Sequence, residues 1–263
     1  MSYTKTPEEM EKIKQGGKIL GEILEKLAKM AKPGVSTWEI DKKAEKLIKK
    51  AGGQPAFKGY QGKKTEKPFP NTICASINDE LVHGIASKEK VLKEGDVFSI
   101  DIGMAWRGYF TDTSITVPIG KVPEKTLKLL AVTKKALEVG IKAVKINGTI
   151  ADIGRAIEDY VKSQGNYGIV RDLVGHGVGH GIHEEPRVPN YYDKKLESWK
   201  IQPGVVIAIE PMITMGDYRI ATVADGWTIK TADSSLCAHF EHTVVVAENG
   251  IIVATRRPNE KLV

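Results

Sequence analysis

Four acidic residues interrupt apolar segments whose composition is typical of buried β-strands. They are Asp101 in FSIDIG, Asp112 in YFTDTS, Glu210 in VIAIEPM and Glu241 in HFEHTV. A carboxylate on a buried strand costs free energy unless it is hydrogen-bonded, paired with a cation or bound to a metal. One such residue fits a hydrogen-bonded structural role, but four in one chain favour a shared metal site.

A glycine-rich segment, GHGVGHGIHEEP at residues 175–186, adds histidines to this set. Its alternating glycines argue against a helix and let the backbone and an imidazole ring approach a ligand closely. Three histidines compete for the role of metal ligand: His176, His180 and His183. Composition alone does not choose among them.

The chemistry of these side chains favours two metal ions rather than one. Two divalent cations neutralise four ionised carboxylates and leave histidine as a neutral ligand. A mostly oxygen ligand set with one imidazole suits Mn²⁺, Fe²⁺, Co²⁺ or Zn²⁺ better than it suits a closed structural zinc site. Carboxylates can bridge two such ions, and a bridging hydroxide then becomes available near neutral pH. The predicted cofactor is therefore a pair of divalent ions.

Helices and strands that could position these residues are visible in the sequence pattern. Thr6 and Glu9 form the capping box of a first helix, which Pro33 ends. Residues 96–117 predict two strands joined by a tight turn near Arg107. Further helices are predicted at about 36–51, 123–145 and 149–164, and further strands near 168–174, 204–210, 219–224 and 242–254.

Two helical segments in different parts of the chain share one pattern. A shift of 113 positions aligns residues 36–52 with residues 149–165, and each segment follows a longer helix and precedes strand-rich sequence. An old duplication explains this match, although shared capping and amphipathic patterns could mimic it. We therefore expect one domain, 1–263, made of two similar halves at roughly 1–120 and 121–263, with the site in the crevice between them.

Composition places the chain among globular proteins. It has 263 residues, of which 41% are hydrophobic and 27% are charged. Its first ten residues, MSYTKTPEEM, show no secretory signal, and the most apolar stretch, at 204–213, is too short to span a bilayer. Cys74 and Cys237 lie too far apart in sequence to suggest a disulfide framework or a cysteine-based zinc site. We expect a soluble, cytoplasmic protein that does not bind membranes.

Positive charge is concentrated near the N-terminus. Residues 1–70 contain 16 lysines and nine acidic residues, whereas the remainder is nearly balanced. Such a basic segment could contact ribosomal RNA through non-specific electrostatics. The alternative is that the lysines cover the solvent-facing sides of two amphipathic helices. Sequence-specific binding of nucleic acid is not expected in either case.

Several short motifs together resemble type I methionine aminopeptidases over nearly the whole chain. They are NDELVHGI at 78–85, DIG at 101–103, TDTS at 111–114, GHGVG at 175–179, HEEP at 183–186, IEPM at 209–212, DGW at 225–227 and EHT at 241–243. The resemblance implies the α+β pita-bread fold of creatinase and these aminopeptidases. In that fold, helices cover an antiparallel sheet made of two pseudo-symmetric α/β halves, and the metal site lies in the central crevice. The resemblance also implies a monomer.

The resemblance assigns roles to the acidic residues. It implies one ion held by Asp101, Asp112 and Glu241, and a second held by Asp112, His176, Glu210 and Glu241. Asp112 and Glu241 are then the bridging ligands. Glu210 is also implied to shuttle a proton to or from the bridging water.

The resemblance also separates the histidines. His183 is implied to meet the scissile peptide and help stabilise the tetrahedral intermediate. His83 is implied to lie near the substrate backbone or the leaving amine. His180 matches no functional position of the family, so we expect it to be structural, as a lone histidine usually is.

A methionine pocket follows from the same resemblance. The positions that match its lining are Tyr60, Phe69, Cys74 and Trp227. An unbranched thioether suits a pocket of aromatic edges with a soft sulfur neighbour. Phe57 stands where many bacterial relatives carry a cysteine.

The implied activity is hydrolytic removal of the initiator methionine from nascent proteins whose second residue is small. Aminopeptidase P and prolidase share the ligand order, but they usually carry a sizeable N-terminal domain, and only about 95 residues precede the first ligand strand here. A non-catalytic relative that binds ribosomes or other partners is a further alternative, although such proteins typically lose metal ligands. Two segments, 61–67 and 189–200, are longer than in most relatives, and the sequence does not define their role.

Overall fold

The computed structural model describes residues 3–62 and 67–260 and has an α+β fold. The helices in this part of the chain are α1 (Pro7–Met30), α2 (Thr37–Lys50), α3 (Glu124–Ala143) and α4 (Ile150–Gln164), with a short 3-10 helix, η1 (Lys194–Ser198). The strands of the central sheet are β1 (Gln54–Pro55), β2 (Ile73–Ile77), β4 (Val97–Trp106), β5 (Tyr109–Pro118), β7 (Gly175–Gly177), β8 (Glu184–Val188), β9 (Val206–Ile209), β14 (Glu241–Ala247) and β15 (Gly250–Val253). Two smaller sheets contain β3 (Glu80–Val82), β6 (Gly168–Ile169), β10 (Met212–Thr214), β11 (Ile220–Thr222), β12 (Ile229–Thr231) and β13 (Cys237–His239).

The central sheet is antiparallel and has the order β1-β4-β5-β14-β9-β7-β8, with β2 also pairing with β4 and β15 with β14. Its longest pairing joins β4 and β5, from Val97 opposite Pro118 to Trp106 opposite Tyr109. β5 and β14 meet in the middle of the sheet, where their described backbones form two residue pairs. The two halves of the chain therefore join at a short strand pairing.

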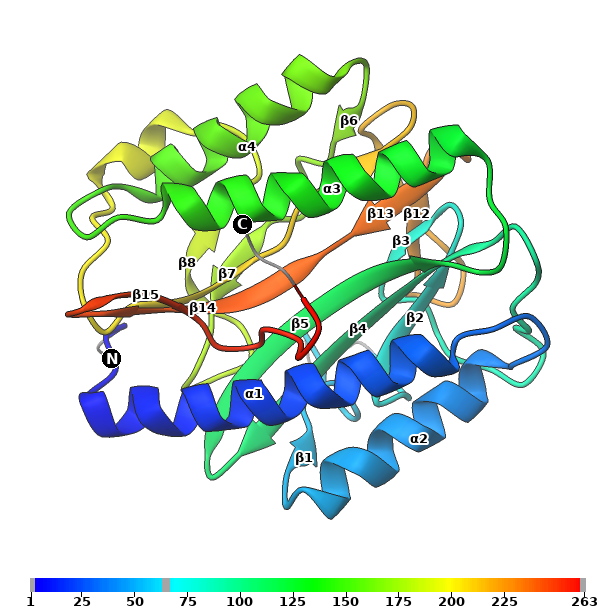
Figure 1. The fold of residues 1–263 in the computed structure, drawn as a ribbon, viewed down its shortest axis with the longest axis horizontal. Helices are drawn as coiled ribbons and strands as arrows, with labels where there is room; N and C mark the ends of the chain where they lie inside the picture. Colours follow the sequence, from blue (N-terminus) through cyan, green and yellow to red (C-terminus); the bar gives the residue numbers. More distant parts are fainter. Residues whose placement is uncertain (1–2, 63–66, 261–263) are drawn as a thin grey trace.

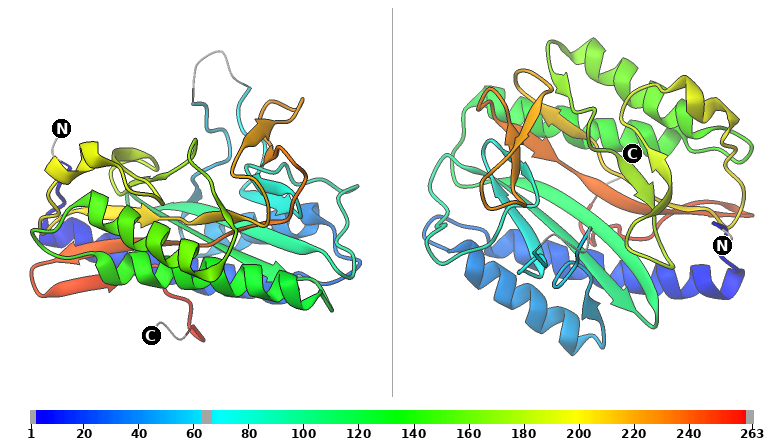
Figure 2. Two further views of the ribbon diagram at one scale, coloured as in Figure 1. Left: turned by 90° about the horizontal axis from the view of Figure 1, so that it is seen from above. Right: turned by 180° about the vertical axis from the view of Figure 1, so that it is seen from behind.

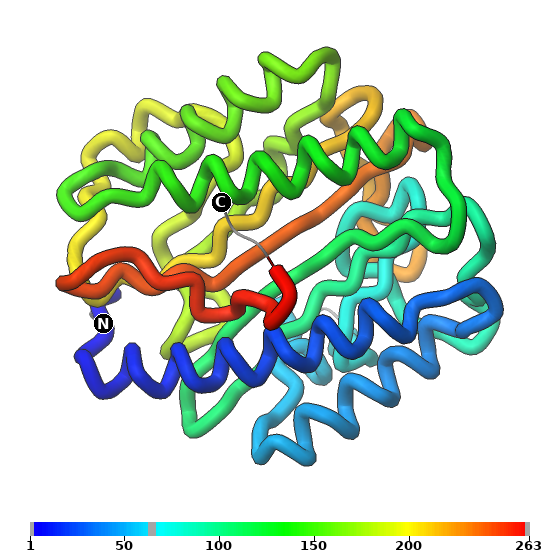
Figure 3. Tube along the Cα trace, in the orientation of Figure 1, coloured from blue at the N-terminus to red at the C-terminus, as the bar shows by residue number. Residues whose placement is uncertain are grey.

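Helices cover one face of this sheet (Figure 1). α1 and α2 cover the half that contains β2, β4 and β5, whereas α3 and α4 cover the half that contains β8 and β9. In the view from above, loops and small hairpins rise on the side opposite the helices (Figure 2). The chain trace shows β5 and β14 side by side between the two helix pairs (Figure 3). One face of the sheet is therefore left open to a site.

Apolar clusters fill the space between the helices and the sheet. In the first half, Leu24 of α1 and Ile100 of β4 are fully buried in one cluster. In the second half, Ile153 of α4 and Ile207 of β9 are fully buried in another. Burying each such side chain contributes about 1.5–3 kcal/mol to folding.

None of the described helices is long and apolar enough to cross a membrane.

A capping box opens three of the four described helices. The pairs of cap residue and third helical residue are Thr6–Glu9, Ser36–Glu39 and Thr149–Asp152. Each cap hydroxyl accepts a hydrogen bond from the backbone N–H of its acidic partner, whose carboxylate accepts one from the backbone N–H of the cap residue. These contacts satisfy N–H groups that a helix start otherwise leaves without partners.

The two aligned segments, 36–52 and 149–165, also occupy similar places. Ser36 and Thr149 each start the second helix of a pair and each form an isolated β-bridge, to Val91 and Lys200 respectively. This recurrence supports our proposal that the halves at roughly 1–120 and 121–263 arose by duplication.

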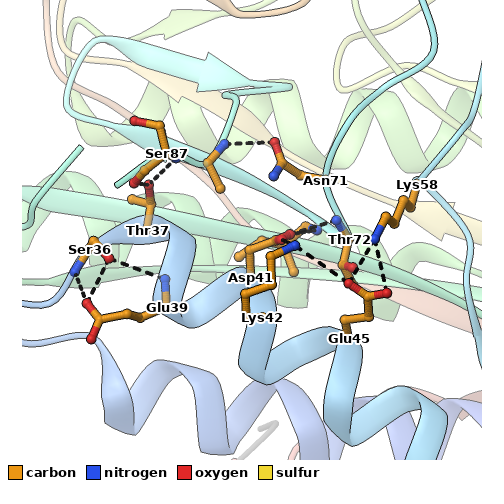
Figure 4. Close-up of polar contacts among 12 residues, drawn as sticks. Ser36, Thr37, Glu39, Asp41, Lys42, Glu45, Lys58, Asn71, Thr72 and Ser87 are labelled. Atoms are coloured by element: carbon orange, nitrogen blue, oxygen red, sulfur yellow. Dashed lines mark hydrogen bonds and ion pairs between the residues drawn. The ribbon is translucent and has the colours of Figure 1, made fainter. Parts of the chain in front are cut away.

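Buried polar contacts fix α2 to the start of β2 (Figure 4). Asp41 is fully buried, and its carboxylate accepts hydrogen bonds from the backbone N–H groups of Thr72 at 2.6 Å and Ile73 at 3.2 Å. The next residue, Cys74, pairs with Asp101 of β4. Asp41 of α2 thereby fixes the start of β2, which places Cys74 beside Asp101 in the sheet.

Most of the predicted elements are confirmed, and the errors concern short strands. The turn predicted near Arg107 joins β4 to β5, and the predicted helices match α1 to α4 within a few residues at each end. The strand predicted at 168–174 is wrong beyond Ile169, because the chain bends there and Leu173 and its neighbour line a pocket. The segment 242–254 contains two strands, β14 and β15, that form a hairpin. Strands of three to five residues, such as β3 and β8, are too short to show a period in the sequence.

Candidate metal centre

A pocket of about 770 Å³ opens beside the central sheet, whose strands contribute Asp101, Asp112, His176 and Glu241 to its lining. All eleven residues that the sequence suggested for the site line this pocket. They are Tyr60, Phe69, Cys74, His83, Asp101, Asp112, His176, His183, Glu210, Trp227 and Glu241. The fold therefore gathers residues that are spread over most of the chain.

The register of the central sheet places three acidic residues on one face. Asp101 of β4 and Glu241 of β14 both pair with Ser114 of β5, from opposite sides. Asp112 lies two residues before Ser114, and alternate residues of a strand face the same side. Each of the three carboxylates accordingly offers an oxygen within 4.8 Å of the other two.

Glu210 and His176 approach this group from the second half of the chain. Glu210 follows β9 and His176 belongs to β7, which pairs with β9. Nε2 of His176 lies 3.7 Å from Oε1 of Glu210 and 4.0 Å from Oδ2 of Asp112. These distances are too long for direct hydrogen bonds. They suit atoms that share one ion, since metal–ligand distances of about 2.0–2.2 Å leave two ligand atoms up to about 4 Å apart.

One buried carboxylate oxygen in this group has no hydrogen-bond partner among the described residues. It is Oδ1 of Asp101. Among the described residues, Asp112 and Glu210 form ion-pair contacts with histidines and not with lysine or arginine. Carboxylates buried without a cation are costly. A donor set of four carboxylates and one imidazole fits divalent cations.

Burial and mutual repulsion raise the pKa values of three carboxylates. Burial raises the pKa of Asp101 to about 6. Burial, together with the charges of the neighbouring carboxylates, raises the pKa values of Asp112 and Glu241 well above their usual range. Burial also opposes ionisation of Glu210, but contact with His239 and other imidazoles lowers the pKa of Glu210 below its usual value. A bound cation favours the ionised form of all four carboxylates.

The histidines occupy distinct environments. Desolvation in the pocket lowers the pKa values of His83 and His183 to about 4, so both rings are neutral near pH 7. Nδ1 of His183 lies 3.0 Å from the hydroxyl oxygen of Tyr60. His180 is not among the residues described as lining the pocket, and its Nε2 lies 3.0 Å from Glu9 of α1. This contact agrees with the structural role expected for His180.

His239 is a residue of this site that the sequence reasoning missed. Its Nε2 lies 3.2 Å from Oε2 of Glu210, and its side chain is 2% exposed. It precedes Glu241 by two positions, and residues with that spacing in an extended segment face the same side. The alternation in HFEH was therefore the signal that could have found it.

The segment 189–200 makes a contact with the site that the sequence analysis did not predict. Asn190 is fully buried, and its side-chain amide donates a hydrogen bond to the carbonyl oxygen of Glu210 at 2.9 Å. This segment thus holds the backbone of an acidic residue in the pocket. Residues 63–66 of the other longer segment, 61–67, lie outside the described residues.

Apolar side chains also line the pocket. Phe57, Phe69 and Cys74 belong to one buried cluster, against which Tyr60 and Trp227 pack. The rings of Phe69 and Trp227 meet edge to face with centroids 5.3 Å apart. Backbone hydrogen bonds of 2.9 Å from Tyr60 N to Phe57 O and from Phe69 N to Tyr60 O hold these residues together. Phe57 therefore contributes to the pocket that the sequence placed around the other four residues.

Comparison with known proteins identifies the family. Residues 11–248 match the model of metallopeptidase family M24. The chain belongs to metallopeptidase family M24. This M24 chain is 45% identical over 255 residues to methionine aminopeptidase of Clostridium acetobutylicum. The match covers 97% of this chain and 99% of that protein. It is 43% identical over 256 residues to methionine aminopeptidase 1 of Bacillus subtilis, with coverage of 97% and 100%.

Solved structures confirm the expected M24 pita-bread fold. The crystal structure of methionine aminopeptidase from Thermotoga maritima superposes with a TM-score of 0.90 at 39% identity and covers 97% of this chain and 99% of that one. The prolidase of Pyrococcus furiosus superposes with a TM-score of 0.75 at 25% identity. The match covers 98% of this chain and 66% of the prolidase.

Proposed function

We propose that this M24 chain is a methionine aminopeptidase, which hydrolyses the peptide bond after an N-terminal methionine. The observation that carries the proposal is one pocket with two kinds of lining. Acidic residues and His176 converge in it, and aromatic residues with Cys74 also line it. The similar proteins from Clostridium acetobutylicum and Bacillus subtilis are each named a methionine aminopeptidase, which supports the proposal.

The proposed cofactor is a pair of divalent ions, with Co²⁺, Mn²⁺, Fe²⁺ and Zn²⁺ as the ions that suit the ligands. The proposed ligand sets are Asp101, Asp112 and Glu241 for one ion, and Asp112, His176, Glu210 and Glu241 for the other. When bound, such ions polarise a substrate carbonyl and lower the pKa of water. The resemblance to type I methionine aminopeptidases assigns Asp112 and Glu241 to both ions. Each belongs to two of the candidate ligand groups, as His176 also does.

Glu210 is the proposed proton carrier. Its lowered pKa keeps the carboxylate ionised near pH 7, where it can accept a proton from the attacking water at a carboxylate oxygen. The same oxygen can then give that proton to the leaving amine. Nε2 of His239 lies 3.2 Å from this carboxylate, and Asn190 holds the backbone carbonyl of Glu210.

His183 and His83 are proposed to contact the substrate. The Tyr60 hydroxyl lies against one ring nitrogen of His183, which leaves the other free to donate a hydrogen bond to the carbonyl oxygen as it gains negative charge. The ring of His83 lies 6.3 Å from that of Trp227, so His83 borders the aromatic lining. There it can hydrogen-bond the substrate backbone or the leaving amine.

The aromatic lining accounts for selectivity toward methionine. An unbranched thioether can fill the space among ring edges such as those of Phe69 and Trp227, and sulfur–aromatic contacts are favourable. Burial raises the pKa of the Cys74 thiol well above its usual range. Cys74 therefore stays neutral and offers a soft, apolar neighbour to the methionine sulfur.

Peptide hydrolysis by metal-stripped protein tests this function. Mn²⁺, Fe²⁺, Co²⁺ or Zn²⁺ is added back singly, with Met-Ala-Ser as substrate and an Xaa-Pro peptide as comparison. The test variant is Asp112→Asn, and the matched control is Asp159→Asn, which changes an exposed aspartate on α4. We expect metal-restored cleavage of Met-Ala-Ser that Asp112→Asn abolishes and Asp159→Asn retains.

Other outcomes would redirect the assignment. Cleavage of the Xaa-Pro peptide alone would favour a prolidase-like activity, to which the structural likeness also extends. Absence of cleavage with every ion would favour a protein that kept the site but not the activity.

The setting of this activity is also part of the proposal. We place the protein in the cytoplasm as a monomer without membrane contact, acting on nascent chains that begin with methionine. The lysines of residues 1–70 are proposed to bring it near ribosomes. Some of them pair with acids one turn away, as Lys12 does with Glu8 at 2.8 Å, which supports the alternative of simple solvation. Salt-sensitive cosedimentation with ribosomes would support contact, and its absence at low salt would refute it.

A further inference from the structure

A threonine hydroxyl extends the short pairing between β5 and β14. The described backbones of these strands pair at two positions, one of which is Ser114 opposite Glu241. At the next position in one direction, Oγ1 of Thr243 accepts a hydrogen bond from the backbone N–H of Asp112 at 2.9 Å and donates one to its carbonyl oxygen at 2.8 Å. One side-chain hydroxyl thus takes the place of two main-chain partners.

The opposite end of the pairing repeats this arrangement. Oγ1 of Thr116 accepts a hydrogen bond from the backbone N–H of His239 at 2.8 Å and donates one to its carbonyl oxygen at 2.8 Å. Between the two ends, Oγ1 of Thr113 donates to the carbonyl oxygen of Glu241 at 2.8 Å. The exposed fractions of these threonines range from zero to 3%, so water does not compete for the bonds.

These hydroxyls hold the backbones of residues that reach the metal centre. Asp112 and Glu241 are assigned to both ions, yet they belong to different strands. The distance between their carboxylates therefore depends on how β5 and β14 meet rather than on the geometry of either strand. Threonine is suited to set that distance because its branched side chain has few rotamers and its hydroxyl both donates and accepts.

We infer that Thr113 and Thr243 are positioning residues that set the spacing of Asp112 and Glu241 and thereby the affinity of the centre for metal. The inference rests on the proposed metal centre. Thr133 provides a comparison inside the same protein, because it is fully buried and its hydroxyl donates to the Leu129 carbonyl oxygen at 2.9 Å within α3. It makes the same kind of bond away from the site.

Titration of Mn²⁺ into metal-free protein tests the inference by calorimetry. The test variants are Thr243→Val and Thr113→Val, which keep the shape of the side chain but remove the hydroxyl. We expect each to bind Mn²⁺ about 10- to 100-fold more weakly, the range typical when support for metal ligands is removed. Thr243→Ser, which keeps the hydroxyl, should restore binding, and Thr133→Val should bind as the unaltered protein does.

Thermal unfolding in EDTA separates stability from affinity. Loss of stability in Thr133→Val with unchanged Mn²⁺ affinity, beside weaker affinity in the Thr243 and Thr113 valine variants, would support a positioning role. Unaltered affinity in both test variants would overturn it, as would an equal loss in Thr133→Val or failure of both test variants to fold. If the unaltered protein binds no Mn²⁺, the proposed metal centre itself fails, and this inference fails with it.

Discussion

The ammonium nitrogen of Lys5 lies 2.6 Å from the carboxylate of Glu184, although 179 positions separate the two residues. The Lys5 side chain is 1% exposed, and that of Glu184 is 14% exposed. Glu184 also accepts a hydrogen bond from the backbone N–H of Gly181. The ion pair therefore ties the N-terminal segment to the glycine-rich loop that carries His183.

Removal of Lys5 should destabilise the protein strongly. Lys5→Met leaves the Glu184 carboxylate without its cation, and breaking a buried pair in this way costs about 3–5 kcal/mol of the free energy of unfolding. The control is Lys12→Met, whose partner Glu8 is 81% exposed, so a much smaller loss is expected. Urea denaturation of both variants measures the difference. Equal losses would contradict a special role for the buried pair.

His183 and His180 should respond differently to replacement by alanine. His183→Ala should lower kcat for Met-Ala-Ser about 10²- to 10³-fold, because the proposed hydrogen-bond donor to the carbonyl oxygen is lost. Binding of Mn²⁺ by the same variant should be retained. His180→Ala should keep kcat, since that ring contacts Glu9 outside the pocket. Loss of Mn²⁺ binding in His183→Ala would instead identify His183 as a metal ligand.

Trp227 should contribute to recognition of methionine. Trp227→Ala removes a ring that contacts Phe69 in the pocket, and kcat/KM for Met-Ala-Ser should fall by roughly 10- to 200-fold, as expected for lost apolar contact. The control is Trp38→Ala, because Trp38 lies outside the lining of that pocket and packs under Lys42 and Lys88. Steady-state kinetics compare the two. A similar fall in both variants would argue against a methionine pocket at Trp227.

Without metal, the contribution of three buried carboxylates to stability should fall as the pH rises from about 4.5 to 7. The pKa of Asp101 is raised to about 6, and those of Asp112 and Glu241 are raised well above their usual range. In the unfolded chain these groups titrate near pH 4. These carboxylates therefore bind more protons in the folded chain in this window, and their contribution to the free energy of unfolding falls as the protons leave. His83 and His183 act in the opposite direction up to about pH 6.5, because their pKa values are lowered to about 4.

Melting temperatures in EDTA across this pH range measure the effect. The melting temperature of Asp101→Asn should rise more, or fall less, with pH than that of the unaltered protein, since an amide does not titrate. Added Mn²⁺ should stabilise the protein more as the pH rises, because metal binds the ionised carboxylates and competes with protons. The same dependence on pH in the two proteins would contradict the prediction.

Local sequence patterns were sufficient to predict much of the fold. The capping box at Thr6 and Glu9, the turn at Arg107 and the four main helices depend on neighbouring residues, and the structure confirms them. Short strands such as β3 and β8 were missed because they are held by partners distant in sequence, and three to five residues carry little periodic signal.

The sequence by itself indicated which acidic residues belong to one candidate metal site, because a carboxylate among apolar residues is costly wherever it lies. It could not choose by composition between His176 and His180, which lie in the same glycine-rich segment. Only the tertiary structure separates them, since pairing of β7 with β9 brings His176 beside Glu210 and leaves His180 against α1. The contact of His239 with Glu210 was decided in the same way, because the direction of a side chain depends on strand pairing between distant parts of the chain.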